Sequence, residues 1–241
     1  MAKILYIKCG GTDIMNRHYQ AILDQAALAG TEVVVTHLWR LEEEKTPFLP
    51  ELPTYQGELF RVIKEAEDQG YTGVIIGCTA DPGLFEAKRM VKIPVTAPLE
   101  ANLHLAAIMA TRVSIIVPAG VSARMRYYDL SRLYGLEHII SSIYSVDLGY
   151  PPPYKLEALM KDEPGRLLET ILQCHQQALD HDVPKIAEKA ISEDGATSIF
   201  CGCTLWSGML GPLAENLKVP VLDPVIGSLR LLEAADDFVR I

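Results

Sequence analysis

Two cysteines, one in each half of the chain, have residue neighbours suited to proton transfer. Cys78 and Cys203 each lie in the sequence Gly-Cys-Thr directly after a short apolar run. We expect a helix to begin at each motif, where the partial positive charge of a helix start favours the thiolate form of cysteine. A thiolate on one face of a substrate carbon can remove a proton, and a thiol on the other face can return one. The pair therefore predicts inversion of a stereocentre without a cofactor.

Groups that could hold a substrate surround the two cysteines. The hydroxyls of Thr79 and Thr204, with neighbouring backbone N–H groups, are suited to bind a carboxylate or an enolate oxygen while a carbanion forms. The same threonines can cap helices, and the two roles are compatible. Tyr127 and Tyr128 are candidates for the wall of a hydrophobic pocket. Turns after the expected strands and motifs supply the remaining candidates for substrate contact, which are Gly11, Thr12, Ala119, Gly120 and Trp206.

The other cysteines give no indication of a metal or a disulfide framework. Five cysteines at irregular spacing are typical of reduced thiols. Cys9 ends the first expected strand and either lines the site or packs in the core, while Cys174 and Cys201 are expected to be structural. Cys201 and Cys203 are two residues apart, but a zinc site needs a second Cys or His pair at ligand spacing, which the sequence lacks. We expect no metal and no cofactor.

The cysteine motifs belong to a longer internal repeat. Cys203 follows Cys78 by 125 positions, and at an offset of 126 the segments 92–99 and 218–225 share four of eight residues. Both halves show an apolar run, Gly-Cys-Thr, a helix, a Lys-x-Pro-Val strand and an x-Pro helix start, in that order. A repeat of this length indicates two similar structural units.

Strands and helices are predicted to alternate along the whole chain. The alternation predicts an α/β fold of two pseudosymmetric domains, each a parallel four-stranded sheet flanked by helices. Ligands bind beyond the carboxyl ends of such strands, so we expect the two motifs to face one another across an interdomain cleft. Expected strands are 3–8, 32–37, 74–77, 93–96, 112–117, 137–143, 197–201 and 219–222. Expected helices include 14–29, 56–69, 98–111, 122–134, 166–181, 184–193 and 224–238.

Proline and acidic residues predict where regular structure is interrupted. Residues 39–54 are expected to form a loop or lid, and residues 144–164 to be irregular. Asp81 is a suitable N-cap for a helix that begins at Pro82. Asp182 is expected to start the helix that contains the proline at position 184.

Charge and hydropathy limit the classes of partner that the protein can have. A net charge of −9 argues against nucleic acid or an anionic membrane as the main partner, but a small anionic substrate needs only a local positive field. No apolar stretch approaches the length of a membrane span. The N-terminal apolar run is too short for a signal peptide, which predicts a cytoplasmic protein.

The repeated motifs resemble those of the aspartate/glutamate/hydantoin racemase superfamily. Residues 77–84, Gly-Cys-Thr-Ala-Asp-Pro-Gly-Leu, are most similar to the hydantoin and allantoin racemase branch, and residues 202–204 with 220–223 fit its second half. After the first strand that branch usually has an Asn-Pro-Asn turn, where this chain has Lys-Cys-Gly-Gly-Thr at residues 8–12. After the fifth expected strand this chain has Pro-Ala-Gly rather than a Thr-rich turn.

The resemblance implies a cofactor-independent racemase in which Cys78 and Cys203 are the acid and base, commonly in a homo-oligomer. It implies one domain from residues 1–97 plus 223–241, which carries Cys78, and a second from residues 98–222. The expected substrate is a small molecule with an acidic C–H beside a carbonyl, either anionic or a cyclic ureide, such as a hydantoin, allantoin or an amino-acid derivative. An aspartate/glutamate-type racemase, a maleate isomerase and an arylmalonate decarboxylase are the enzymatic alternatives. A small-molecule binding protein is the alternative from another class.

Overall fold

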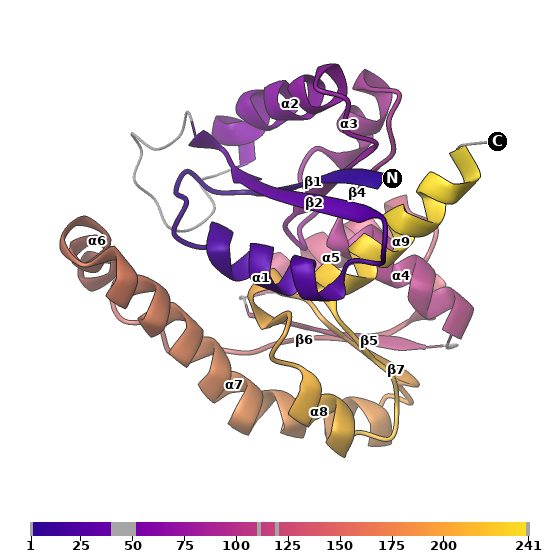
Figure 1. The fold of residues 1–241 in the computed structure, drawn as a ribbon. Helices are drawn as coiled ribbons and strands as arrows, with labels where there is room; N and C mark the ends of the chain where they lie inside the picture. The colour runs from indigo at the N-terminus through magenta and orange to yellow at the C-terminus, as the bar shows by residue number, and fades with distance from the viewer. Residues whose placement is uncertain (1, 40–51, 110–111, 119–120, 240–241) are drawn as a thin grey trace. The chain divides into compact units, whose positions relative to one another are not determined.

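The chain forms two compact units in the computed structural model, which describes residues 2–39, 52–109, 112–118 and 121–239 (Figure 1). The first unit comprises Met1–Ala97, Pro152–Leu168 and Ser228–Ile241, and the second comprises Pro98–Pro151 and Glu169–Gly227. The sequence-based boundaries put residues 152–168 in the second domain, whereas these residues group with the first unit. None of the described helices is long and apolar enough to cross a membrane.

A parallel four-stranded sheet organises the first unit. Its strand order is β2-β1-β3-β4, and all neighbouring strands are parallel. The strands are β1 Ala2–Lys8, β2 Thr31–His37, β3 Gly73–Gly77 and β4 Val95–Thr96. The helices of this unit include α1 Asn16–Ala26, α2 Leu52–Asp68, α3 Leu84–Met90 and α6 Pro153–Asp162. Every residue of β3 is buried, as expected for a parallel strand covered on both faces.

The second unit repeats this plan. Its sheet has the order β6-β5-β7-β8, again with parallel neighbours, so the third strand in each sheet leads to a cysteine motif. The strands are β5 Val113–Val117, β6 Ile140–Ser145, β7 Ser198–Cys201 and β8 Val221–Leu222. The helical elements are α4 Pro98–Met109, α5 Val121–Leu133, η2 Glu137–Ile139, α7 Pro164–Ser192, η3 Thr204–Trp206, α8 Gly211–Asn216 and α9 Pro224–Val239, of which α7 and α9 extend across the unit boundary. The predicted fold class, two parallel four-stranded sheets flanked by helices, is confirmed.

The core of the second unit lies on both faces of its sheet. Ile116 and Cys201 pack in one apolar cluster with residues of α7 and α8. Ile115 and Phe200, their neighbours along the same strands, pack in another with residues of α4 and α5. Because successive residues of a strand point to opposite faces, this alternation places an apolar layer on each side.

Three predictions about the interruptions were wrong. Residues 52–54 belong to α2, although residues 40–51 of the predicted loop lie outside the described residues. The segment 144–164 contains α6, because Pro153 occupies the first position of that helix, where a missing N–H costs nothing. The two helices predicted around Asp182 are one helix, α7, with Pro184 inside it. Proline is tolerated there while burial of the neighbouring turns holds the helix together.

Several boundaries also differ from the prediction. Residues 137–139 form the short 3₁₀ helix η2 instead of the start of a strand, and β6 runs on to Ser145. The strands expected at 93–96 and 219–222 are two residues long in the structure. These are edge strands, where one side of the hydrogen-bond ladder is open and the pairing ends early.

Candidate active site

The first candidate cysteine follows a glycine that packs tightly against a neighbouring strand. Gly77 ends β3, and a Cβ atom at this position would lie 2.5 Å from Cζ of Tyr6 in the neighbouring strand β1. Tyr6 is fully buried and its ring packs on Tyr19 at a centroid distance of 5.2 Å. The absence of a side chain at Gly77 therefore lets the two strands meet and sets the position of Cys78, which is buried.

No helix begins at Cys78, which corrects the prediction. α3 begins at Leu84, and Gly83 before it has a φ of 64°. Asp81, the predicted N-cap, has a φ of 43° and is buried, and Pro82 lies ahead of the helix instead of opening it. Because two left-handed residues flank Pro82, the chain must turn before a helix can start.

A backbone N–H group at the sulfur takes the place of the expected helix start. The N–H of Ala80 donates a hydrogen bond to Sγ of Cys78 at 3.5 Å. The N–H of Asp81 donates to the Cys78 carbonyl at 3.0 Å, which closes the turn. A hydrogen bond to sulfur is the kind of contact that stabilises a thiolate, while burial of the side chain acts in the opposite direction. Thr79, which lies within the turn, is buried.

Cys9 lies near the Cys78 motif and is buried. Burial raises the pKa of the Cys9 thiol well above its usual value, the charges on Cys78 and Asp81 add to the rise, and Lys8 opposes it. Sγ of Cys9 donates to the carbonyl of Ile7 at 3.7 Å. Cys9 is therefore a protonated neighbour of the site and is poorly suited to act as a second base.

Sequence reasoning missed Lys8, the last residue of β1. Its side chain is buried, and Nζ donates to the carbonyl of Thr12 at 2.8 Å and to the Thr12 hydroxyl at 3.3 Å. Burial lowers the pKa of Lys8 to about 8, although the charges on Cys9 and Asp13 act to raise it. The predicted substrate contact Thr12 thus binds the lysine, and Gly11 beside it is buried. A lysine directly after the apolar run 4–7 was the signal available in the sequence.

The second candidate cysteine follows a glycine with the same kind of close contact. A Cβ atom at Gly202 would lie 2.7 Å from Cγ1 of Val117 and 3.1 Å from the carbonyl oxygen of Ile116, both in β5. The Gly202 N–H donates to that carbonyl at 2.7 Å, and its own carbonyl accepts a bond from the Tyr127 hydroxyl at 3.1 Å. Cys203 comes next and is partly exposed, in contrast to the first cysteine.

The helix expected after Cys203 is a single 3₁₀ turn. Thr204–Trp206 forms η3, and α8 begins only at Gly211. Thr204 is buried. Trp206 is fully buried in the apolar cluster of the second unit, and its indole N–H has no hydrogen-bond partner within the described part of the chain. Trp206, a predicted substrate contact, is thus part of the apolar core of the second unit.

Sequence reasoning missed Tyr150, whose phenol is within electrostatic reach of Cys203, and His175, which is hydrogen-bonded to it. The Tyr150 hydroxyl and Nε2 of His175 share a hydrogen bond of 2.5 Å, and the ring of His175 packs on Trp206. Burial raises the pKa of Tyr150, and the charges on Cys203 and Cys174 raise it further, so the phenol keeps its proton. Burial lowers the pKa of His175 to about 4, so the imidazole is neutral near pH 7.

Cys174 and Cys201 are buried in the same apolar cluster of the second unit. Burial raises the pKa of both thiols, and the charges on Asp223 and Cys203 add to the rise at Cys201. Over the residues that the structure describes, His, Cys, Asp and Glu side chains form no group of three that could hold a metal ion. Neither thiol is placed for chemistry.

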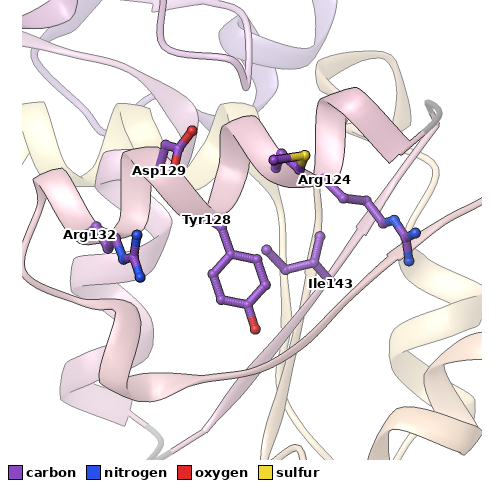
Figure 2. Close-up of a pocket in the computed structure, with 6 residues that line it drawn as sticks. Arg124, Tyr128, Asp129, Arg132 and Ile143 are labelled. Carbon is purple, nitrogen blue, oxygen red and sulfur yellow. The ribbon is translucent and has the colours of Figure 1, made fainter.

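A separate hollow lies on the surface of the second unit, between α5 and β6. Its lining contains none of the predicted site residues except Tyr128, which is half exposed (Figure 2). The lining residues are Arg124, Met125, Tyr128, Asp129, Arg132 and Ile143. Two of the predicted contacts, Ala119 and Gly120, lie outside the described residues.

Comparison with known proteins agrees with the motifs. A family model described as Asp/Glu/Hydantoin racemase matches residues 4–231. A hydantoin racemase of Paenarthrobacter aurescens is 32% identical over 181 residues, which are 73% of this chain and 67% of that protein. A hydantoin racemase of Rhizobium meliloti is 30% identical over 172 residues, which are 71% of this chain and 63% of that protein. The matched region thus spans about two thirds of these relatives.

A solved structure shows the same fold over the whole chain. The allantoin racemase from Klebsiella pneumoniae superposes with a TM-score of 0.77 at 22% identity and covers 99% of this chain and 89% of its own.

Proposed function

The chain belongs to the Asp/Glu/hydantoin racemase family, and on this premise we propose that it is a cofactor-independent racemase with Cys78 and Cys203 as its acid and base. Its substrate has an acidic C–H beside a carbonyl, as in a hydantoin, allantoin or a related amino-acid derivative. One observation carries the proposal. Each thiol directly follows the third strand of its sheet, behind a glycine that packs against the strand next to it.

The proposed reaction needs one thiolate and one thiol. The thiolate removes the proton from the stereocentre and becomes a thiol, while the electron pair moves onto the carbonyl to form an enolate. The other thiol gives its proton to the opposite face and becomes a thiolate. The enzyme then holds the reverse protonation state, which suits the other enantiomer.

Local contacts support a role for each cysteine. At Cys78 the Ala80 N–H donates to the sulfur, which favours the thiolate before substrate enters. At Cys203 the partial exposure of the thiol and the protonated phenol of Tyr150 nearby leave the sulfur able to exchange a proton. Thr79 and Thr204 follow the two sulfurs along the chain, and we assign their hydroxyls to the enolate or carboxylate oxygens.

Proton exchange in D₂O tests the proposal. Single enantiomers of hydantoins, allantoin, aspartate and glutamate, together with an arylmalonate, are incubated with the wild type, Cys78→Ala and Cys203→Ala, and followed by NMR and polarimetry. Cys174→Ala, which removes a buried thiol from a helix, is the matched control. We expect the wild type and the control to racemise one substrate class, and each site variant to lose at least about 10²-fold of that rate.

The variants with one remaining thiol give a sharper readout. Each should still exchange the proton of one enantiomer, with retention of configuration, because the surviving cysteine reaches one face only. Full racemisation by either variant would refute the two-cysteine mechanism. Because two enantiomers have equal free energies, a racemase must also show equal kcat/KM in both directions. Loss of CO₂ from an arylmalonate without racemisation would instead identify a decarboxylase.

A further inference from the structure

The buried lysine at the end of β1 indicates which substrates the first unit is built to receive. We propose that Lys8 binds an anionic group of the substrate, so that the preferred substrate carries a carboxylate in addition to its acidic C–H. This inference rests on the proposed function, which it makes more specific.

Within the described part of the chain, Lys8 has no partner of opposite charge. Its side chain is 5% exposed, and its hydrogen bonds to the carbonyl and hydroxyl of Thr12 use two of the three donors of an ammonium group. No carboxylate lies within ion-pair distance of Nζ among the residues that the structure describes. Asp13 is an exposed acidic residue whose charge acts on Lys8. It offsets only part of the fall in the pKa of Lys8 that burial causes.

A buried charge without a counter-charge is unfavourable in a folded protein. This is why burial draws the pKa of Lys8 down to about 8, yet the amine remains mostly protonated at pH 7. Titratable groups that are perturbed by burial cluster at functional sites. An incoming carboxylate would restore full pairing.

The backbone after β1 is shaped around the ammonium group. A Cβ atom at Gly10 would lie 2.9 Å from Nζ of Lys8, so the lysine occupies the space that a side chain at Gly10 would take. The Gly10 N–H donates to the carbonyl of Lys8 at 2.9 Å, and its own carbonyl accepts from Leu38 at 3.0 Å. Both backbone groups of Gly10 are therefore hydrogen-bonded, which holds the turn and the ammonium group of Lys8 in a defined position.

That position is at the correct edge of the sheet for substrate. Lys8 pairs in register with Gly77, the residue before Cys78, so both chain segments leave the sheet at its carboxyl edge. Cys9 is within electrostatic reach of both Lys8 and Cys78. Ligands of parallel α/β sheets bind at this edge. In a chain with a net charge of −9, a buried cation at this edge supplies the local positive field that an anionic substrate requires.

Two ligands that differ only in charge test the inference. Hydantoin-5-acetate carries a carboxylate, and hydantoin-5-acetamide has the same shape without the charge. Binding of each racemate is measured by calorimetry at pH 7 to the wild type, Lys8→Met and Lys3→Met. The control, Lys3→Met, removes the same charge from the other end of the same strand.

We expect the wild type and Lys3→Met to bind the acetate roughly ten- to a hundredfold more tightly than the acetamide, as for hydrogen bonds to charged groups. Lys8→Met should bind both alike. Equal binding of the two ligands by the wild type, or a preference that survives in Lys8→Met, would overturn the inference. Failure of the acetate to bind the wild type would overturn it too.

Urea unfolding of the same variants separates binding from a structural role. Because the substitution removes an unpaired buried charge, Lys8→Met should be at least as stable as the wild type. If Lys8→Met is instead less stable and still prefers the acetate over the acetamide, Lys8 has a structural role only. The binding measurement does not depend on turnover. If the protein racemises a substrate but shows no charge preference, only the role of Lys8 is refuted. If it shows the charge preference but does not racemise, only the proposed activity is refuted.

Discussion

A single added methyl group at Gly77 tests whether the close approach of β3 to β1 is what positions Cys78. In Gly77→Ala the new Cβ would lie 2.5, 2.6 and 2.7 Å from Cζ, Cε1 and Oη of Tyr6. Ordinary van der Waals contact begins near 3.4 Å, so the ring would have to recede by about 0.9 Å. Tyr6 is fully buried against Tyr19, so its ring cannot recede without displacing its neighbours.

The expected loss of stability follows from this overlap. Overpacking a close-packed core by a methyl group costs about 1–3 kcal/mol. For a chain of this length each kcal/mol lowers Tm by about 2–4 °C. Gly202→Ala should behave alike, because its Cβ would meet Val117 at 2.7 Å and the Ile116 carbonyl at 3.1 Å.

Thermal and urea unfolding of the two variants would be compared with Gly57→Ala. Gly57 is exposed in α2, and a Cβ atom there would meet nothing within 4 Å, so alanine should raise stability by up to about 1 kcal/mol through helix propensity. Tyr6→Leu removes the ring, and Gly77→Ala should cost less in that background than in the wild type. The argument would be refuted if Gly77→Ala were as stable as the wild type. It would also be refuted if the substitution lowered the free energy of unfolding equally in the wild type and in Tyr6→Leu.

Two further predictions concern the second unit. Burial lowers the pKa of His175 to about 4, so the folded protein excludes a proton that the unfolded chain accepts near pH 6.5. Stability should fall by on the order of 3 kcal/mol as pH drops from 6.5 to 4, and urea unfolding of His175→Gln should lack this component; an unchanged pH slope would contradict it. Oδ1 of Asp223 accepts N–H bonds from Val225 and Ile226, both at 2.9 Å, at the start of α9. Asp223→Ala should lose about 0.5–2 kcal/mol in the same assay and Asp223→Asn less, whereas equal losses would argue against capping.

The sequence was most informative where one local pattern determines one element. Short apolar runs rich in β-branched residues, such as 73–77 and 113–117, are typical of buried strands, and they appear as β3 and β5. The repeat then implied two sheets of the same kind. Strand order was not predictable from these patterns, because it depends on which apolar faces pack together.

Proline was the main source of error. At positions 151–153 the run of prolines was interpreted as irregular chain, yet Pro153 opens α6. At position 184 proline was interpreted as a helix start, yet it lies inside α7. Pro153 follows the local preference of proline for the first position of a helix. Inside α7 the preference of Pro184 is weaker than burial of the surrounding helix, since Val183 and Ala187 are fully buried. Proline alone does not reveal which of these effects prevails.

The local structure expected at the two cysteine motifs differs from the structure observed there. We expected helix starts to lower the pKa of the thiols, but Cys78 is followed by a turn and Cys203 by a single 3₁₀ turn. The two cysteines were chosen because Gly-Cys-Thr is repeated, and the structure shows a close strand contact at the glycine of each copy, Gly77 and Gly202. Such a contact is invisible until the neighbouring strand is known.

The groups beside the thiols could not be found from the repeat, because they are not repeated. Lys8 ends β1, whereas the corresponding strand of the second unit, β5, ends with the apolar Val117. Tyr150 and His175 come from the loop after β6 and from α7 and share a hydrogen bond. The shared part of the two halves therefore fixes where each thiol sits, and the unshared part determines its chemical surroundings. If the two thiols perform the same proton transfer in opposite directions, the differences between the halves have to serve substrate recognition, and a charged residue present in only one half is the group best able to fix which way round a substrate binds.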